Sequence, residues 1–518
     1  MNPYIKICLK MFLYTRLFFI FIIIISYSSN LVTKYDLSTD LLSISEINEK
    51  SPNFIEKIIS KFLSYFSSYD AIHYILIAKN DYFNDNIFAF FPLFPWLIRG
   101  LARMFELLFP FTSEFIPFMI SGFIMSNFFC LINAILIFIQ IYQLTNSFKK
   151  AKISTFLFLI NPGSIFYISI YSENFYLLLE LILIHFITKS GHEKFDELNL
   201  RSTYDLTESK PSYFFHIAGL LLGLLLTRSN SIALCTYFII PSLLILLYKE
   251  KYIKSFVYFN FYNNLCQFFR LLNKVYREIG IYIILCFHAL ICFIYVTKIK
   301  PRGIICAYIK RGINKSLTKY NLFEDWCYNK ESENGIKSFY SYIEKEYWNV
   351  GFLKQYSINT IDRIILSIPM NILGLYVLYK IYSYFNFAEL LPEFNFGKFF
   401  MYKNLYQGKI YSKHEENGHF NEIKNIYKIN VTTNAFIIGG GLNFLVNFLI
   451  LVFIAHPQIN NRILTACPIL YLAICDDVID FMENNKRGNY KRGFAILLFF
   501  GSYALLGCIM QVGAYGFA

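Results

Sequence analysis

Apolar residues in this 518-residue chain come in blocks of roughly twenty, separated by short polar stretches rich in Lys, Asn and Tyr. A helix rises 1.5 Å per residue, so about twenty apolar residues cross the ~30 Å hydrocarbon core of a bilayer. The pattern therefore predicts an all-α integral membrane protein with about 11 transmembrane helices. The expected spans are 17–27, 115–143, 153–170, 173–188, 213–227, 231–248, 278–297, 361–384, 433–455, 460–481 and 493–515.

Basic clusters between the blocks indicate how the chain is oriented. The first block follows Lys6, Lys10 and Arg16, and no small-x-small cleavage site follows it, which predicts an uncleaved anchor with a cytosolic N-terminus. Counting the spans from that end places four further basic clusters on the cytosolic side, in agreement with the positive-inside rule. These clusters lie at 149–152, 189–194, 249–254 and 486–492.

The span count divides the chain into five parts. Within the first luminal loop, apolar residues from Phe54 to Phe66 recur at spacings of three and four, which predicts a helix lying flat on the membrane surface. The parts are a cytosolic N-terminus with the first anchor (1–30), the first luminal loop (31–111), a transmembrane bundle (112–297), a second luminal loop (298–358) and a C-terminal bundle (359–518) that contains a cytosolic loop (385–430).

Composition and charge narrow the class of protein. Hydrophobic residues make up 56% of the chain and charged residues 16%, against about 25% charged in an average globular protein, which excludes an ordinary soluble enzyme. A net charge of +13 would suggest a nucleic-acid partner in a soluble chain. Here Lys and Arg gather at the ends of apolar blocks, where they meet anionic lipid headgroups, so we expect membrane lipids as partners and no nucleic acid.

The eleven cysteines show no metal-type spacing, and most lie inside apolar blocks, where a thiol behaves as a small hydrophobe. No metal site is expected. Cys306 and Cys327 differ because both fall in a polar loop. A disulfide between them is possible if that loop faces an oxidising compartment. Asn314 begins a glycosylation sequon in the same loop.

Two acidic residues are candidates for chemistry. Asp70 follows the predicted surface helix, and a carboxylate at a membrane edge near a cation can accept a proton from a hydroxyl. The alternative is that Asp70 caps the next helix. Glu173 emerges on the same luminal face, and ionisable residues at the membrane usually face a cavity. The alternative for Glu173 is that it stabilises a helix N-terminus electrostatically.

Polar turns on the same face supply the other candidates. Arg228, in Thr227-Arg228-Ser229-Asn230, offers a planar fork that suits a lipid phosphate, although an interfacial arginine also reaches toward headgroups without a specific role. Two more turns carry polar residues. Each turn alone is weak evidence for a functional site, because a Trp often anchors a protein at the membrane interface and a His is often structural. Their residues are Trp348, Asn349, His456, Gln458 and Arg462.

These turns also carry a resemblance. The motifs are YDAIHYILIAKNDY (69–82), FAFFPLFP (88–95), NPGSIFYISIYSENFYLLL (161–179), TRSN (227–230), YWNVGFLK (347–354) and HPQINNRIL (456–464). In this order the chain resembles the GPI mannosyltransferase II family (PIG-V type), of the GT-C class of glycosyltransferases. It departs from the family at Tyr69, where a Trp is usual, so the packing beside Asp70 is in question.

The resemblance implies a GT-C-like fold in the endoplasmic reticulum membrane with a luminal active face. It implies transfer of the second mannose, in α1,6 linkage, from dolichyl-phosphate mannose to a mannosyl-glucosaminyl-phosphatidylinositol acceptor, with no cofactor. Family members work with a small accessory membrane subunit in some lineages. The implied site places Asp70 as the base, His73 and Glu173 on the acceptor side, and Arg228 on the donor phosphate with Arg462 in reserve. The further substrate-binding candidates are Asn230, Trp348, Asn349, His456 and Gln458.

Two other functions stay open. Another dolichol-phosphate-mannose transferase would keep Asp70 and change the acceptor. A multi-pass lipid transporter would be favoured by charges near the middle of the membrane and by paired halves, and neither pattern is plain in the sequence.

Overall fold

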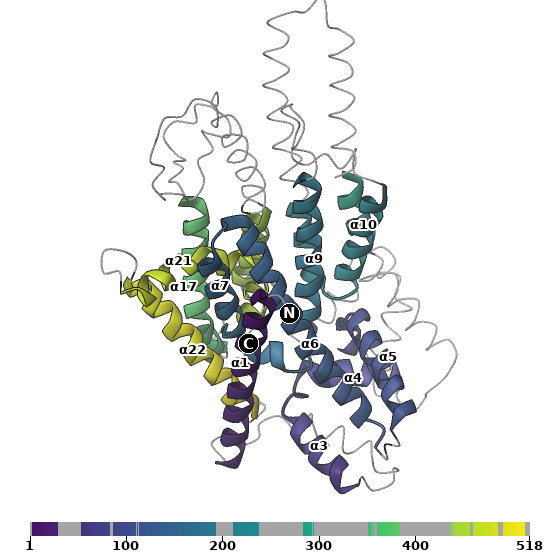
Figure 1. Ribbon diagram of the computed structural model, residues 1–518. Coiled ribbons are helices and arrows are strands. Elements are labelled where there is room, and N and C mark those ends of the chain that lie inside the picture. Colours follow the sequence, from purple (N-terminus) through teal and green to yellow (C-terminus); the bar gives the residue numbers. More distant parts are fainter. Residues whose placement is uncertain are drawn as a thin grey trace, which may run out of the picture.

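The part of the chain that the computed structural model describes is all helical, with no β-strand among its residues (Figure 1). The predictions for Cys306, Asn314 and Cys327 concern residues outside the described part of the chain. The described residues are 3–29, 53–82, 86–109, 111, 113–192, 211–237, 283–292, 294, 351–354, 356, 360–383, 437, 439–455, 459–484 and 490–512.

The α-helices differ widely in length. They include α1 (Pro3–Ser28), α3 (Phe54–Ser64), α4 (Asp70–Asn80), α5 (Leu93–Leu108), α6 (Ile116–Thr145), α7 (Phe148–Leu159), α8 (Ser164–Ile168), α9 (Glu173–His192), α10 (Pro211–Leu225), α17 (Ile361–Ser383), α20 (Asn460–Leu464), α21 (Ile469–Met482) and α22 (Tyr490–Val512). Two further helical stretches cover Ile283–Cys292 and Gly439–Phe453. The two short 3₁₀ helices are η1 (Asn86–Ala89) and η2 (Ser229–Cys235).

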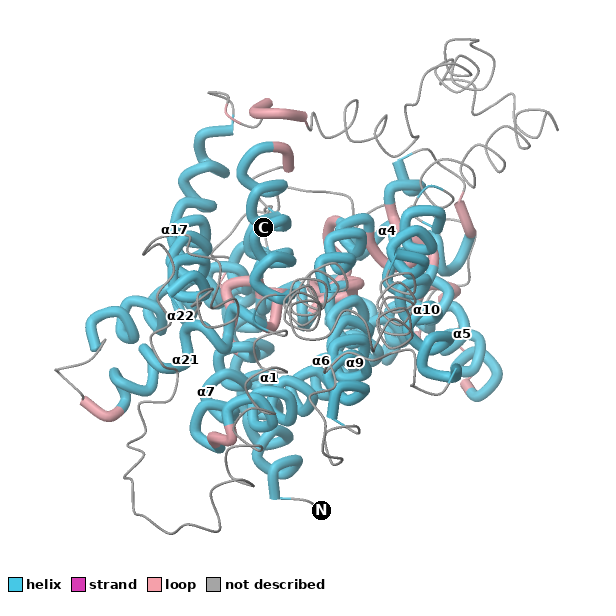
Figure 2. The backbone as a smooth tube through the Cα atoms, turned by 90° about the horizontal axis from the view of Figure 1, so that it is seen from above, coloured by secondary structure: helices cyan, strands magenta, loops and turns pink. Residues whose placement is uncertain are grey.

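Helix α6 is the centre of the described structure. It contacts α1, α3, α4, α5, α7, α8 and α9, and it crosses the middle of the views in Figures 1 and 2. Its sequence is apolar between Pro117 in its first turn, where the fixed φ of proline suits a helix start, and Asn146, which ends it in the left-handed conformation. Two of its buried amides bond to α9: Asn133 donates to the Asn174 carbonyl at 2.8 Å, and Gln140 to the Leu181 carbonyl at 2.7 Å.

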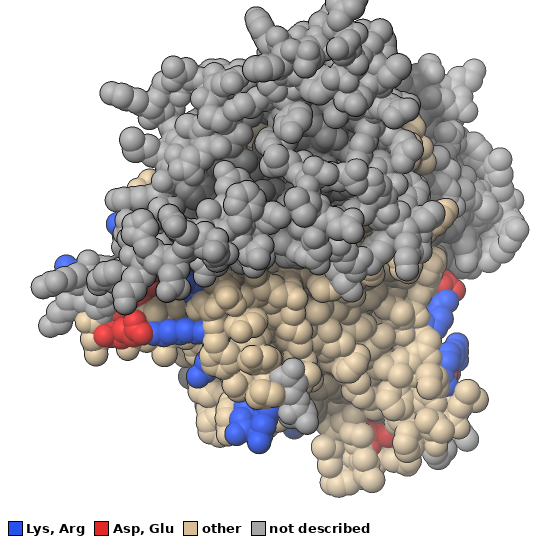
Figure 3. All heavy atoms as spheres, turned by 45° about the horizontal axis from the view of Figure 1, so that its top comes forward, with Lys and Arg blue, Asp and Glu red and all other residues tan. Residues whose placement is uncertain are grey.

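Four of the described helices, α1, α6, α17 and α22, are long and apolar enough to cross a membrane. The chain is therefore a multi-pass membrane protein. Figure 3 agrees with this. On the face that it shows, the visible described surface is largely uncharged, and charged side chains lie toward the margins of that surface.

The structure corrects three predicted spans. Helix α1 begins at Pro3, so Arg16 is not a flanking charge but lies buried inside the helix, where it donates to the Cys130 sulfur of α6. The predicted span 153–170 breaks after Leu159, because Asn161-Pro162-Gly163 cannot continue the helix, and α8 follows separately. The predicted span 460–481 is likewise two helices, α20 and α21, separated by a turn that ends at Pro468.

The predicted amphipathic helix after Pro52 is confirmed as α3. Glu56 in its first turn accepts a hydrogen bond from the Asn53 backbone N–H at 3.2 Å, which satisfies one of the free donors at the helix start. A tight turn then leads into α4, and Arg99 of α5 donates to the last carbonyls of α4, at Ile77 and Ala78. Helices α4 and α5 thus pack on each other, and α3, α4 and α5 each contact α6.

Ion pairs link α7 to α21 at the end of the bundle opposite to Asp70. Lys150 pairs with Asp476 at 2.9 Å, and Lys149 pairs with Glu483. Between α17 and α21, Lys380 contacts the fully buried Asp477 at 3.0 Å. The basic residues at 149–150, which the span count assigned to one side of the membrane, are thus held at one end of the bundle by acidic residues of α21.

Close packing of α22 on α21 gives a stability prediction. A Cβ at Gly493 would overlap the Asp477 carbonyl oxygen, whereas a Cβ at Gly501 of the same helix would meet no atom within 4 Å. We expect Gly493→Ala to lower the free energy of unfolding by about 1–3 kcal/mol because the backbones must separate. Gly501→Ala is the matched control and should leave stability unchanged or raise it by up to about 1 kcal/mol. Thermal unfolding in detergent measures both, and equal stabilities would contradict the packing.

Candidate functional site

Asp70 is the first residue of α4, and its carboxylate does not cap that helix. The N-cap is Tyr69, whose φ of 58° lies in a region that is costly for a residue with a side chain. Asp70 instead accepts a hydrogen bond from Arg462, between its Oδ2 and the arginine Nη1, at 2.7 Å. The capping alternative for Asp70 is therefore wrong.

Arg462 joins Asp70 to Glu173. Its Nε and Nη2 lie 2.7 and 2.6 Å from the Oε1 of Glu173, so all three of its guanidinium nitrogens contact a carboxylate. Arg228 contacts the same Oε1 through its Nη1 at 2.7 Å. Asp70, Arg462, Glu173 and Arg228 thus form a continuous chain of charges, called here the charged network, whose members come from four segments far apart in the sequence.

Exposure differs along the charged network. Glu173 is fully buried, Arg462 and Arg228 are 10% and 16% exposed, and Asp70 is 30% exposed. The Oδ1 of Asp70 and two nitrogens of Arg228 have no hydrogen-bond partner among the described residues. One end of the network therefore offers an accessible carboxylate oxygen, and the other offers a cation with unused donors.

Tight local packing places Arg462 in the network. A Cβ at Gly163 would lie 2.7 Å from the Asn461 carbonyl, so only glycine allows α20 to approach the 161–163 turn this closely. The guanidinium then lies over two rings, with its carbon 4.9 Å from the ring centre of Phe166 and 5.0 Å from that of Tyr171. Cation–π attraction and the two carboxylates together fix the orientation of the side chain.

The electrostatics follow from burial and opposite charge. Burial alone lowers the pKa of Arg462, but the charges of Glu173 and Asp70 outweigh it, and its pKa is raised well above the usual value. The network contains two carboxylates and two guanidinium groups, so its charges balance. A buried carboxylate such as Glu173 would be strongly unfavourable without these partners.

Aromatic and hydroxyl side chains surround the network. The Tyr74 hydroxyl lies 2.8 Å from the Ser172 hydroxyl, and burial raises the pKa of Tyr74 above its usual value, so it stays a neutral group. The Tyr171 hydroxyl donates to the Ser68 carbonyl at 3.1 Å, which ties the turn before Asp70 to the turn before Glu173. His73 stacks on Phe90 at 4.7 Å.

The structure brings together four of the residues selected from the sequence and describes two more. Asp70, Glu173, Arg228 and Arg462 form the network, and His73 lies one turn into α4 from Asp70. Asn230 follows Arg228 in η2, and its buried side-chain oxygen has no hydrogen-bond partner among the described residues. The remaining candidates lie outside the described residues: Trp348, Asn349, His456 and Gln458.

Sequence reasoning underestimated two residues. Arg462 was only a reserve phosphate ligand, but it is the link between both acids. Tyr74 was not selected, although it lies four residues after Asp70 and therefore on the same face of α4. That spacing was a usable signal, whereas nothing in the sequence pairs Arg462 with residues about 290 and 390 positions away.

The arrangement suits transfer of a group between an alcohol and an anionic leaving group. The accessible oxygen of Asp70 can take a proton, and the unused donors of Arg228 can bind an anion. Among the described residues, no group of three or more His, Cys, Asp and Glu side chains is placed to hold a metal ion.

These features define a multi-pass membrane protein with an acid and cation site at one end of its helical bundle. The family model described as "Mannosyltransferase (PIG-V)" matches residues 5–518. The chain therefore belongs to the PIG-V mannosyltransferase family.

Curated relatives carry consistent names. The chain is 24% identical over 346 residues to "GPI mannosyltransferase 2" of Drosophila melanogaster, covering 64% of this chain and 67% of the relative. It is 24% identical over 340 residues to "GPI alpha-1,6-mannosyltransferase 2" of Homo sapiens, covering 62% of this chain and 58% of the relative. The chain thus spans about three fifths to two thirds of the length of these relatives.

Among solved structures, the chain is similar to the archaeal oligosaccharyltransferase AglB from Archaeoglobus fulgidus in complex with an inhibitory peptide and a dolichol-phosphate. The identity is 11%, the match covers 86% of this chain and 52% of that chain, and the TM-score is 0.39.

The network predicts the effect of removing its central cation. Arg462→Gln leaves the fully buried Glu173 with Arg228 as its single charged partner and Asp70 with none, and we expect the free energy of unfolding to fall by about 3–5 kcal/mol. Arg103→Gln is the control, because Arg103 is 63% exposed and pairs with Glu106 on the same helix, a contact worth under about 1 kcal/mol. Chemical or thermal unfolding in detergent compares them, and similar losses would mean that the network contributes little to stability.

Proposed function

We propose that the chain transfers the second mannose of the GPI anchor precursor. In this proposal the donor is dolichyl-phosphate mannose, the acceptor is mannosyl-glucosaminyl-phosphatidylinositol, and the new linkage is α1,6. The observation that carries the proposal is the charged network, which pairs an accessible acid with an anion-binding arginine in a chain of the PIG-V family. The names of the curated relatives support the same activity.

The chemistry is a single inverting displacement. The primary hydroxyl of the acceptor mannose attacks the anomeric carbon of the donor as the bond from that carbon to the phosphate oxygen breaks. The hydroxyl proton passes to Asp70, and the electron pair of the broken bond leaves on dolichyl phosphate. A β-linked donor then gives an α-linked product, so one base suffices and no covalent intermediate is required.

Each member of the charged network has a distinct task in this reaction. Arg462 orients the Asp70 carboxylate through Oδ2 and leaves Oδ1 for the acceptor hydroxyl. Arg228 binds the donor phosphate with the nitrogens that Glu173 does not occupy, and it offsets the charge that develops on the leaving group. Glu173 keeps both arginines in place. We assign His73 to the acceptor side and Asn230 to the donor side, and Trp348, Asn349, His456 and Gln458 are the further proposed substrate-binding residues.

The proposal places the protein in the endoplasmic reticulum membrane with the charged network on the luminal side. The ion-paired lysines at the opposite end of α7 support this orientation, since basic residues favour the cytosolic side of a membrane. The lipid-linked substrates reach the site through the membrane, and a small accessory membrane subunit is a further proposed partner.

Replacement of Asp70 tests the proposed base. Asp70→Asn keeps the shape of the side chain but cannot accept the proton, so mannose transfer should fall by about 10²–10⁴-fold, with normal protein level. The control is Asp81→Asn at the other end of α4, where the carboxylate is 59% exposed and contacts Arg99. The assay expresses each chain in cells that lack the second GPI mannosyltransferase and measures GPI proteins at the surface. Failure of the wild-type chain to restore them would refute the proposed function, and rescue by Asp70→Asn would remove Asp70 from catalysis.

A graded series tests Arg228 as the phosphate ligand. Arg228→Lys keeps the charge but loses the planar fork, so donor use should weaken by an intermediate amount, and Arg228→Ala should nearly abolish it. The measurement is mannose transfer in microsomes with titrated dolichyl-phosphate mannose at equal protein level. If the arginine only reaches toward headgroups, Lys will serve as well as Arg, and the donor phosphate must bind elsewhere.

A further inference from the structure

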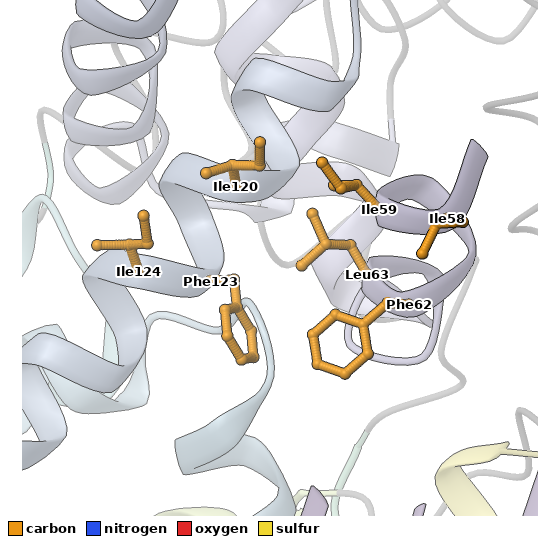
Figure 4. Close-up of a pocket in the computed structure, with 7 residues that line it drawn as sticks. All are labelled: Ile58, Ile59, Phe62, Leu63, Ile120, Phe123 and Ile124. Atoms are coloured by element: carbon orange, nitrogen blue, oxygen red, sulfur yellow. The ribbon is translucent and has the colours of Figure 1, made fainter. Parts of the chain in front are cut away.

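A groove of about 350 Å³ lies between α3 and α6, outside the charged network (Figure 4). Every residue of its lining is apolar, and in Figure 4 the side chains of the two helices lie around a common space. Its volume is within the range of about 300–1,000 Å³ that is usual for small-ligand sites. The lining consists of Ile58, Ile59, Phe62 and Leu63 of α3 and Ile120, Phe123 and Ile124 of α6.

The groove is open to the surroundings of the helix bundle. Ile58 on one wall is 54% exposed and Ile124 on the other is 45% exposed. Phe54 and Ile55, one turn earlier on α3, are 78% and 69% exposed. An amphipathic helix with so much exposed apolar surface fits the membrane interface, and a groove without polar groups fits a hydrocarbon chain.

The walls of the groove continue into the charged network. The ring of Phe123 packs on that of Phe66 with centres 4.8 Å apart, and the Phe66 carbonyl accepts from the Ile170 N–H at 3.0 Å. The next residue, Tyr171, lies under the guanidinium of Arg462. A ligand bound in the groove and a ligand bound at Asp70 would therefore be held by one connected set of residues.

Two cations lie beside the groove. Lys57 and Lys61 are exposed, lie one turn apart on α3, and precede the lining residues Ile58 and Phe62. The Lys61 ammonium is 5.2 Å from the ring centre of Tyr27 in α1. Lysines at a membrane surface attract phosphate headgroups, so the groove combines a hydrocarbon slot with an anion-binding edge.

We propose that the groove holds an acyl chain of the phosphatidylinositol-linked acceptor, with the acceptor's phosphodiester beside Lys57 and Lys61. This inference rests on the proposed function and names the part of the site that recognises the acceptor lipid.

Spacing favours the acceptor over the donor. In the donor, the isoprenoid begins at the phosphate that leaves the reacting carbon, so its first unit must lie beside Arg228. In the acceptor, three linked rings, two sugars and the inositol, separate the reacting hydroxyl from the phosphodiester. Lys61 lies nine residues before Asp70, and the end of α3 at Ser64 and a turn separate the two residues. A lipid anchor held at α3 therefore suits the acceptor, whose sugar chain bridges this interval.

The test fills the groove and varies the acceptor lipid. The full-length chain is assayed in microsomes with the diacyl acceptor, with the same acceptor after removal of its acyl chains, and with titrated donor. We expect Ile120→Trp to raise the KM for the diacyl acceptor about tenfold, because its acyl chain loses apolar contact, and to leave the KM for the deacylated acceptor and for the donor unchanged. The matched control is Ile372→Trp, since Ile372 of α17 is 62% exposed and lies outside the groove.

An equal rise in the KM for both acceptors, or a rise in the KM for the donor, would overturn the proposal. If Ile120→Trp does not accumulate, the double variant Lys57→Gln with Lys61→Gln replaces it. That variant should raise the KM for the diacyl and the deacylated acceptor, which both carry the phosphodiester. It should not raise the KM for a third acceptor, the same glycan without the phosphate, and an equal rise in KM for all three acceptors would overturn the proposal.

A binding experiment separates the groove from the activity. If the wild-type chain transfers no mannose to any acceptor, the proposed function fails, and a photoactivatable phosphatidylinositol with the reactive group on its acyl chain still tests the groove. Labelling of peptides from α3 and α6 that Ile120→Trp removes would support the site, and labelling elsewhere would overturn it.

Discussion

The buried ion pairs between Glu173 and two arginines are the constraint on which the rest of the site depends. A fully buried ionised carboxylate is strongly unfavourable without cationic partners, and Glu173 is fully buried. Arg462 and Arg228 meet this requirement from α20 and from the start of η2. Because Arg462 also holds Asp70, the same ion pairs position the accessible acid on α4. Stability and chemistry are therefore coupled through one carboxylate.

Helix breaks make that geometry possible. Asn161-Pro162-Gly163 ends α7 early, and the turn before Pro468 separates α20 from α21. Two continuous helices in these places would not bring the 161–163 turn and α20 into contact. The breaks instead leave short segments that meet where Gly163 touches Asn461, and this contact sets the height of Arg462 next to Glu173. The irregular backbone at 161–163 is buried in protein.

The two ends of the bundle have different electrostatic designs. At the end that holds Asp70, acids and arginines are buried together and leave one oxygen and a few donors accessible. At the other end, Lys149 and Lys150 pair with the partly exposed Glu483 and Asp476, and Lys380 contacts the buried Asp477. In the proposed reaction the first arrangement orients the reacting groups, and the second ties α7 to α21. The apolar groove between α3 and α6 adds a third environment, adjacent to the first through Phe66 and Tyr171.

The sequence by itself determined the class of protein, the apolar helices and most residues of the candidate site. Apolar blocks predicted membrane helices such as α6 and α22, because block length reports directly on bilayer thickness, and the spacing of apolar residues predicted α3. The sequence left a capping role open for Asp70 and a structural alternative open for both Glu173 and Arg228, because a local pattern cannot say which distant charge a side chain meets.

Only the tertiary structure decided those pairings. Arg462 contacts residues 392 and 289 positions away, and no periodicity in the sequence encodes such distances. The structure also showed that the blocks at 153–170 and 460–481 break, at Asn161-Pro162-Gly163 and before Pro468, which the apolar length of each block does not reveal. Hydrophobic length is a local property of a sequence, whereas the partner of a buried charge is a property of the fold.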